Sequence, residues 1–330
     1  MLDEEALQRL KGKKNLLAFS GGVDSTALYH LLEKNGIAFD IAFVNYGIRA
    51  QSEEEEAYAK ALAARDGKRV FVRRCTIEAG DFEHKARIAR YRFFEEVIKE
   101  GNYTNLITAH QLDDMLEWLL MQLCKGAGCV ELVGMESVED REGFTLVRPL
   151  LYTPKEALVR YLESASIRYF IDESNLSDRH TRNRFRKEAA SFLMQECADG
   201  IARSFRYLKK DKEALLPEAE VLFSKERLTL LKRPENDLKS IRLIDRELKK
   251  KGYILSAAQK EEILKNRSVV VGGEWAVDMS PKRIWIAPYR ETVMPKAFKE
   301  RCRRCGVAPK VRPYIFEEGF AEELFSLLGC

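Results

Sequence analysis

The stretch of this 330-residue sequence best suited to chemistry is the six-residue segment that reads Ser-Gly-Gly-Val-Asp-Ser. A short apolar run, Leu16–Phe19, precedes it, and a helical pattern with one apolar face follows it as far as Leu32. A strand that enters a glycine turn at a helix start presents backbone N–H groups at the positive end of the helix dipole, which favours an anion. We therefore predict a phosphate-binding loop formed by Ser20, Gly21, Gly22, Val23, Asp24 and Ser25.

Asp24 does not suit a simple anion site, because a carboxylate repels phosphate unless a cation lies between them. We interpret it as a Mg²⁺ ligand. The segment lacks the Gly-Lys-Ser/Thr of a Walker A loop and the third glycine of a dinucleotide fingerprint. It resembles the PP-loop of ATP pyrophosphatases, which cleave ATP to AMP and pyrophosphate, and this resemblance implies ATP as a substrate. The competing interpretation is an ordinary glycine-rich turn between a strand and a helix.

Two further groups of side chains suit the same chemistry. His110, Asp113 and Asp114 open a predicted helix directly after a strand, and two adjacent carboxylates favour a cation or an amine as a partner. Helix capping by Asp113 is the alternative explanation. Arg87 and Arg90 share one face of a long predicted helix, where guanidinium groups can bind phosphate in a bidentate way. A later arginine cluster suits either phosphate or an RNA backbone and comprises Arg182, Arg184 and Arg186.

Composition limits the class of protein. The chain is 45% hydrophobic and 33% charged, and no apolar run approaches the length of a membrane span, so we expect a cytoplasmic protein without a membrane partner. Seven cysteines, an odd number, argue against a disulfide framework, and the lone Cys302–Cys305 pair is half a zinc site at most. The net charge is only +4, but four basic runs suit a polyanion: 179–186, 203–212, 249–251 and 296–312.

Apolar runs alternate with helical patterns through the first two thirds of the chain. This alternation predicts an α/β fold with a doubly wound parallel sheet, similar to a Rossmann fold, in which ligands bind at the carboxyl ends of the strands. We expect a helix that starts at Pro154 with Thr153 as its cap, and another from Gln51 to Arg65 with Ser52 as its N-cap. The predicted strands are 16–19, 37–45, 68–73, 105–109, 144–151 and 167–171.

Pro217 ends a predicted helix, so we expect a domain boundary there, with residues 1–216 as the catalytic domain and 217–330 as a smaller α+β domain. The later part has no evident catalytic constellation. Its patterns predict a hairpin around Gly272-Gly273-Glu274, flanked by strands at 269–271 and 275–279. The remaining predicted elements are helices at 236–251, 256–265 and 295–304 and a strand at 283–287.

Together these residues resemble one family of PP-loop enzymes, the tRNA(Ile)-lysidine synthases. The resemblance covers about the first two thirds of the chain in order, and more loosely the segment from Gly306 to Arg312. The matching residues are Ser20–Ser25, Gly47-Ile48-Arg49, Ser52, Glu54–Glu56, Ala86-Arg87, Arg90-Tyr91, Phe93-Phe94, Thr108-Ala109-His110, Asp113-Asp114, Glu117, Gly126-Ala127-Gly128, Arg148-Pro149-Leu150, Asp172-Glu173-Ser174-Asn175, Arg182-Asn183 and Arg186. The sequence departs from the family pattern at Tyr46, Gln111 and Trp118.

The resemblance implies an enzyme that ligates L-lysine to C2 of the wobble cytidine of tRNA(Ile) with a CAU anticodon, through an adenylated cytidine. It implies Mg²⁺ on Asp24 and on one of Asp113 or Asp114, of which Asp114 is preferred. It also implies nucleotide contacts from His110, Arg87, Arg90 and Arg182, and tRNA binding by the C-terminal domain.

Two other functions stay open from the sequence: a PP-loop enzyme that thiolates tRNA, and a non-catalytic, nucleotide-dependent RNA-binding module. The first of these usually needs cysteines or an iron–sulfur cluster beside the loop, and Cys75, Cys124 and Cys129 show no such pattern. A GMP or NAD synthetase is a weaker alternative, because it leaves the basic runs unexplained. The oligomeric state is also open, a homodimer included.

Overall fold

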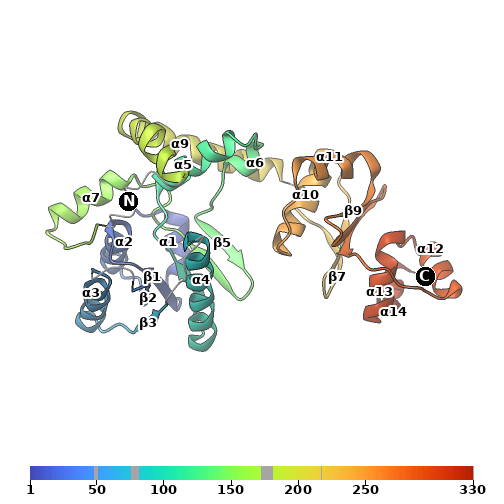
Figure 1. Cartoon of the computed structure of the whole chain (residues 1–330), viewed down its shortest axis with the longest axis horizontal. Coiled ribbons are helices and arrows are strands. Elements are labelled where there is room, and N and C mark those ends of the chain that lie inside the picture. The colour runs from blue at the N-terminus through green and yellow to red at the C-terminus, as the bar shows by residue number, and fades with distance from the viewer. Residues whose placement is uncertain (48–50, 76–81, 172–180, 217, 330) are drawn as a thin grey trace. The chain divides into compact units, whose positions relative to one another are not determined.

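The computed structural model describes residues 1–47, 51–75, 82–171, 181–216 and 218–329, with no side-chain description at 82, 83, 181 and 182 (Figure 1). The chain divides into two compact units, Met1–Lys210 and Asp211–Cys330. The division falls inside a long helix, α9, that ends at Leu215, close to the predicted boundary at Pro217. No helix within the described ranges is both long enough and apolar enough to cross a membrane.

The first unit is built on a six-stranded sheet with the order β3-β2-β1-β4-β6-β5. Neighbouring strands are parallel except at one edge, where β5 pairs antiparallel with β6. The order reverses between β1 and β4, the kind of switch point at which doubly wound sheets bind ligands. The predicted α/β fold is therefore confirmed. The strands are β1 (Asn15–Phe19), β2 (Phe39–Asn45), β3 (Val70–Arg74), β4 (Asn105–Ile107), β5 (Val138–Arg141) and β6 (Phe144–Val147).

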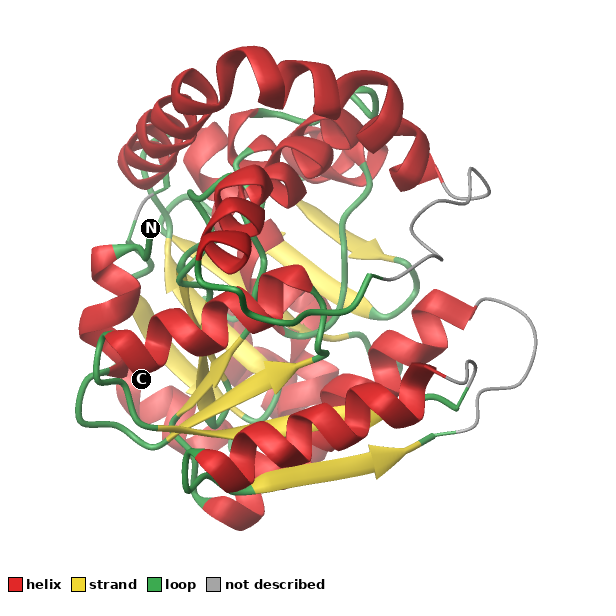
Figure 2. Cartoon of the chain, turned by 90° about the vertical axis from the view of Figure 1, so that its left-hand side faces the viewer, coloured by secondary structure: helices red, strands yellow, loops and turns green. Residues whose placement is uncertain are grey.

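Helices cover both faces of this sheet, and Figure 2 shows the strands between them. On one face, Leu17 and Phe19 of β1 join a core with α1 (Glu4–Leu10), α2 (Val23–Lys34), α3 (Gln51–Arg65) and α7 (Lys155–Ser164). On the other face, Leu16 packs with Phe93 and Phe94 of α4 (Phe82–Gly101). A strand buried on both faces has apolar residues at consecutive positions, which explains the uninterrupted apolar run in β1.

The first unit has a second group of helices, and the two longest of them share a core that includes Leu112, Met115 and Met194. Its elements are α5 (Leu112–Leu123), α6 (Cys129–Leu132), α8 (Thr181–Phe185), a π-helical turn (Arg186–Ala190) and α9 (Ser191–Leu215). Helix α9 contains one non-helical residue, Cys197, with φ −135°. The two helices predicted for this region therefore correspond to segments on either side of Cys197.

Three local predictions were wrong. Helix α7 starts at Lys155 with Pro154 as its N-cap, and the Thr153 hydroxyl donates instead to the Met1 carbonyl, so Thr153 is not the cap. Helix α3 starts at Gln51, so Ser52 lies inside it and is not its cap. The segment 167–171 is not a strand of the sheet, because its ladder contact is a single bridge between Phe170 and Gly22.

The second unit contains a five-stranded antiparallel sheet with the order β7-β8-β11-β10-β9. Apolar cores cover both faces, which explains why β10 is buried at every position. This confirms the predicted α+β class and the hairpin, in which Trp275 pairs with Val271. Its elements are β7 (Val221–Lys225), β8 (Leu228–Lys232), α10 (Asp237–Lys250), α11 (Ala257–Asn266), β9 (Ser268–Val271), β10 (Trp275–Met279), β11 (Arg283–Pro288), α12 (Lys296–Arg304), a 3₁₀ turn (Pro309–Val311), α13 (Arg312–Glu318) and α14 (Ala321–Leu328).

Candidate active site

The predicted phosphate-binding loop joins β1 to α2 at the switch point of the first sheet. Gly21 has φ +78°, and a Cβ there would come 3.3 Å from the Phe170 ring, so both the conformation and the space favour glycine. The Ser25 and Thr26 hydroxyls donate to the carbonyls of Gly22 and Gly21, and so they hold the loop in shape. Gly22 caps α2 without any side-chain hydrogen bond, which leaves the helix start accessible to a ligand.

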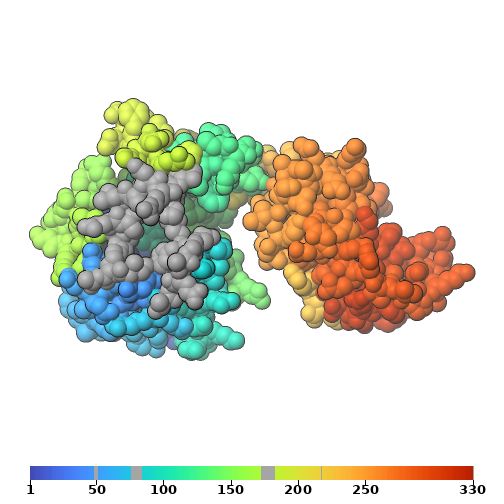
Figure 3. All heavy atoms as spheres, in the orientation of Figure 1, coloured from blue at the N-terminus to red at the C-terminus, as the bar shows by residue number. Residues whose placement is uncertain are grey.

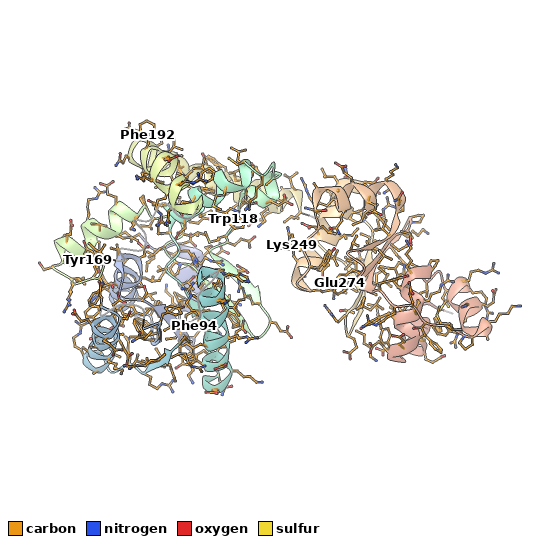
Figure 4. The ribbon with its side chains drawn as sticks, viewed as in Figure 1. Phe94, Trp118, Tyr169, Phe192, Lys249 and Glu274 are labelled. Carbon is orange, nitrogen blue, oxygen red and sulfur yellow. The ribbon has the colours of Figure 1, made fainter. Side chains whose placement is uncertain are left out.

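This loop forms part of a cavity of about 590 Å³ in the first unit. Its walls come from segments far apart in the sequence, and Figure 3 shows blue, teal and yellow-green segments gathered in this unit. Apolar wall residues include Val44 of β2 and Phe94 of α4, which is labelled in Figure 4. The acidic, basic and histidine residues of the wall are Asp24, Arg90, His110, Asp114, Lys155 and Arg186.

Asp24 is the most strongly perturbed carboxyl group of this cavity. Burial raises its pKa to about 7, Lys155 and Arg186 oppose the rise, and the negative charges of Asp114 and Asp113 add to it. Its Oδ1 atom is buried and has no hydrogen-bond partner among the described residues. A buried carboxylate oxygen without a partner is costly, so a cation at this position would stabilise it.

The two neighbouring aspartates play different structural roles. Asp114 lines the cavity. Its Oδ2 accepts a hydrogen bond of 3.0 Å from the Gln111 N–H, as part of the capping box at the start of α5. Asp113 Oδ2 accepts from the Lys155 N–H at 3.0 Å, and Asp113 is not among the cavity-lining residues. Burial also raises the pKa of Asp113. The α5 cap is therefore Gln111, and Asp113 instead caps the start of α7.

A metal site here has few protein ligands. No group of three or more His, Cys, Asp or Glu side chains suited to a metal ion occurs among the residues that the structure describes. Asp24 and Asp114 supply two carboxylates in one cavity. Mg²⁺ in nucleotide enzymes is commonly held by one or two carboxylates together with substrate phosphates and water, so this donor set fits Mg²⁺.

The predicted arginines divide between the cavity and the surface. Arg90 lines the cavity, whereas Arg87 is exposed, with its guanidinium 4.8 Å from the Tyr91 ring centroid. Arg186 lines the cavity and forms an ion pair with the buried Glu117, with Nε 2.5 Å from Oε1. Arg184 is exposed and does not line the cavity. The side chain of Arg182 and the predicted residues 48–49 and 172–175 lie outside the described residues.

Some site residues were missed from the sequence. Lys155 lines the cavity. The signal that could have identified it is its position at the start of a helix that follows a strand of the sheet. The Phe170–Ile171 segment also lines the cavity. A hydrogen bond of 2.9 Å from the Phe170 N–H to the Gly21 carbonyl connects this segment to the loop. The sequence predicted a strand at 167–171, but a single bridge to the loop has no periodic pattern that would place this segment at the cavity.

The three departures from the family pattern have separate places. The Tyr46 side chain lines the cavity, and its hydroxyl donates to the Ala86 carbonyl at 3.2 Å. Gln111 caps α5. Trp118, labelled in Figure 4, donates from Nε1 to the Glu131 carbonyl at 3.1 Å. Of these three, Tyr46 alone contributes to the cavity wall.

The fold and the loop define a PP-loop protein, and a family model described as a PP-loop domain matches residues 3–193. A solved U34-tRNA thiolase from Methanococcus maripaludis is similar in fold, with 17% identity, a TM-score of 0.52, and coverage of 66% of this chain and 80% of that one. At this identity the similarity supports the fold alone.

Two curated relatives are much closer in sequence. The tRNA(Ile)-lysidine synthase of Wolinella succinogenes is 46% identical, over 96% of this chain and 97% of the relative. That of Helicobacter pylori is 42% identical, over 94% of this chain and 91% of the relative. The chain belongs to the tRNA(Ile)-lysidine synthase family, whose members are ligases that form a carbon–nitrogen bond.

Proposed function

We propose that this chain uses ATP to ligate L-lysine to C2 of the wobble cytidine of tRNA(Ile) with a CAU anticodon. The observation that carries the proposal is the convergence of the PP-loop, Asp114 and Arg186 on the cavity at the switch point of the sheet. Family membership along nearly the whole chain supports the same assignment.

In the first step, the cytidine O2 atom attacks the α-phosphorus of ATP. The bond from that phosphorus to the oxygen bridging to the β-phosphate breaks, and pyrophosphate leaves with its electrons. This step needs alignment of the reactants and compensation of negative charge more than it needs proton transfer. The backbone N–H groups at the start of α2 and the guanidinium groups of Arg90 and Arg186 suit that task.

In the second step, the ε-amine of lysine attacks C2 of the adenylated cytidine. The C2–O2 bond breaks, AMP leaves, and the amine loses a proton. An amine attacks only in its neutral form, so the site must bind the lysine side chain and then accept a proton from it. Asp114 and His110 line the cavity and are our candidates for these two roles.

Mg²⁺ would be held by Asp24 and Asp114, together with phosphate oxygens. When bound, it would neutralise charge on the departing pyrophosphate. The unpartnered Oδ1 of Asp24 supports this assignment. Removing the charge of Asp24 therefore tests the metal and the loop together.

We further propose that residues 1–216 act as the catalytic domain and residues 217–330 as a tRNA-binding domain. Helix α12 supports the second role, because Lys296, Lys299, Arg301, Arg303 and Arg304 all lie on it. Met-type tRNAs share the CAU anticodon, so contacts away from the anticodon must contribute to specificity.

The thiolation alternative receives little support from the cysteines. Cys75, Cys124 and Cys129 are free thiols, and none of the three lines the cavity. A non-catalytic RNA-binding module would not need a buried carboxylate beside the loop that binds phosphate.

The experiment that tests the proposal is ATP–pyrophosphate exchange with tRNA(Ile) transcript, with and without L-lysine. We expect exchange that depends on tRNA, and AMP release with lysine incorporation when lysine is added. Sulfur transfer without lysine incorporation would favour the thiolation alternative, and ATP binding without pyrophosphate release would favour the non-catalytic one.

A further inference from the structure

Helix α7 begins at the wall of the cavity. Its first residue, Lys155, lines the cavity, and Pro154 caps it in an extended conformation without a side-chain hydrogen bond. The helix is 10 residues long and amphipathic, with Leu158 and Leu162 buried in the core beneath the sheet. Packing of that apolar face therefore fixes the direction in which α7 approaches the cavity.

Two hydrogen bonds connect the start of α7 to the start of α5. The Leu112 N–H donates to the Thr153 carbonyl at 3.1 Å, and the Lys155 N–H donates to Asp113 Oδ2 at 3.0 Å. Leu112 and Thr153 are buried. Asp113 therefore fixes the backbone of Lys155 from a neighbouring helix, although it does not itself line the cavity.

Lys155 shares the cavity with the phosphate-binding loop. It lines the same cavity as Ser20 and Gly22 of that loop. Arg186 is already paired with the buried Glu117. Lys155 therefore lies at the wall of the cavity that the phosphate-binding loop also lines, and the compact charge of its ammonium suits phosphate oxygens.

We propose that Lys155 binds phosphate oxygens of the pyrophosphate leaving group, and that Asp113 is a positioning residue that fixes Lys155 for this contact. The proposal rests on the proposed function, and it assigns Lys155 to the step in which the bond between the α-phosphorus and the bridging oxygen breaks. The ammonium compensates the negative charge that gathers on pyrophosphate, and no proton is transferred. Asp113 acts through a hydrogen bond to the backbone.

The competing interpretation is that Lys155 merely neutralises Asp24 and Asp114 in the folded protein. In that case its removal would lower the thermal stability, and the affinity for pyrophosphate would stay unchanged. The two interpretations therefore differ in a binding measurement that needs no turnover.

The test compares Lys155→Met with Lys155→Arg and with Arg160→Met, a matched change on the exposed face of the same helix. We expect Lys155→Met to weaken binding of Mg²⁺-pyrophosphate about 10-fold or more in titration calorimetry. We also expect it to lower kcat for ATP–pyrophosphate exchange about 10²-fold, with little change in KM for lysine. Lys155→Arg should retain more of the pyrophosphate affinity and of kcat than Lys155→Met does. Arg160→Met should match the wild type in both quantities.

Asp113 is tested by its own pair of variants. Asp113→Asn keeps an oxygen acceptor for the Lys155 N–H, so we expect near-normal pyrophosphate affinity. Asp113→Ala removes the acceptor and should lower pyrophosphate affinity and kcat in the same direction as Lys155→Met. The double variant Asp113→Ala/Lys155→Met should be no worse than Lys155→Met alone, because both changes remove one contact.

Three results would overturn the proposal. Wild-type pyrophosphate affinity in a folded Lys155→Met variant would remove the contact. An equal loss in Arg160→Met would show that the effect is not local. An Asp113→Asn variant as impaired as Asp113→Ala, with a raised Mg²⁺ requirement, would make Asp113 a metal ligand. A wild-type chain that incorporates no lysine would instead refute the proposed function, while pyrophosphate binding would still test Lys155.

Discussion

A buried carboxylate in each unit of this chain has different surroundings. At the carboxyl edge of the first sheet, Asp24 keeps a buried oxygen without a partner among the described residues, and Asp113 and Asp114 lie near it. In the second unit the sheet is covered by apolar side chains on both faces, and the buried carboxylate of Asp245 forms ion pairs with Lys249 and Lys260. The first arrangement costs stability unless a ligand binds, whereas the carboxylate with lysine partners needs no ligand to compensate its charge.

This difference suggests that residues needed for activity and residues needed for stability lie largely in different units. A polar cavity with concentrated charge is expected in the unit that performs the chemistry. The second unit, which we propose to bind tRNA, has apolar cores on both faces of its sheet. Variants that move activity and stability in opposite directions therefore test the contrast.

The largest expected loss of stability is in the second unit. Trp285 is fully buried between the strands and helices of its core, so Trp285→Ala should lower the free energy of unfolding by about 3–5 kcal/mol. Urea denaturation monitored by circular dichroism measures this. ATP binding by the first unit should persist under native conditions.

Trp285→Phe is the matched control. It keeps most of the buried area and removes an indole N–H that has no hydrogen-bond partner among the described residues. We expect a loss of under about 1.5 kcal/mol. An equal loss in both variants would show that packing area is not what stabilises this unit.

Asp24→Asn should lower activity without lowering stability. We expect kcat for lysine incorporation to fall about 10²- to 10³-fold, because the variant loses the charge that pairs with a cation beside the phosphates. The free energy of unfolding in metal-free buffer should stay equal or rise, because the amide avoids burying a charge. Asp199→Asn, at an exposed position of α9, is the control. Full activity in Asp24→Asn would refute the assigned role.

Removing the second unit tests whether it binds tRNA while the first unit binds ATP. A chain that ends at Leu216 should bind tRNA(Ile) at least about 10-fold more weakly, because it lacks the basic groups of α12. Its affinity for ATP should change by less than about 2-fold, measured by the same titration at fixed salt. Unchanged tRNA affinity would place the RNA-binding surface in the first unit.

The smallest effect concerns Glu56 of α3, which accepts hydrogen bonds from Arg74 of the edge strand β3. Burial favours a raised pKa, but hydrogen bonds from Arg74, Lys60 and Asn45 lower the pKa of Glu56 to about 2. Its partners Lys60 and Arg74 are largely exposed, so solvent screening limits the contribution. We expect Glu56→Gln to cost about 1–2 kcal/mol at pH 7.

The sign of the pH dependence follows from that lowered pKa. The stabilisation by Glu56 is present above its unfolded pKa of about 4.5 and is lost as the pH falls toward 2. The stability difference between wild type and Glu56→Gln should therefore vanish over this interval. Glu53→Gln, at an exposed position, should show little difference at any pH. A difference that persists at pH 2 would contradict the assignment.

Much of the first unit could be predicted from the sequence. Buried parallel strands have uninterrupted apolar runs, so β1 and β2 were found, and the PP-loop has a local signature at Ser20–Ser25. Ligands bind at the carboxyl ends of parallel strands, and this rule placed His110 and Asp114 near the site. Both line the cavity in the structure. These features depend on short segments whose neighbours are close in the sequence.

The features that could not be predicted depend on distant partners. Asp113 and Asp114 are identical in type, and only the position of Lys155 determines that one of them caps α7. Strand β5 (Val138–Arg141) is an edge strand with polar residues, so it lacked an apolar pattern. Lys155 itself has no motif around it, because its role comes from the direction of α7 rather than from its neighbours.

The π-helical turn at Arg186–Ala190 has a consequence for how this chain tolerates length changes. A π turn carries one residue more than an α turn, and it sits where Arg186 meets Glu117. Deleting one residue there would restore regular winding and rotate the preceding residues by about 100° about the axis, which would carry the guanidinium away from the cavity. Homologous chains should therefore vary in composition across this turn far more readily than they vary in residue number.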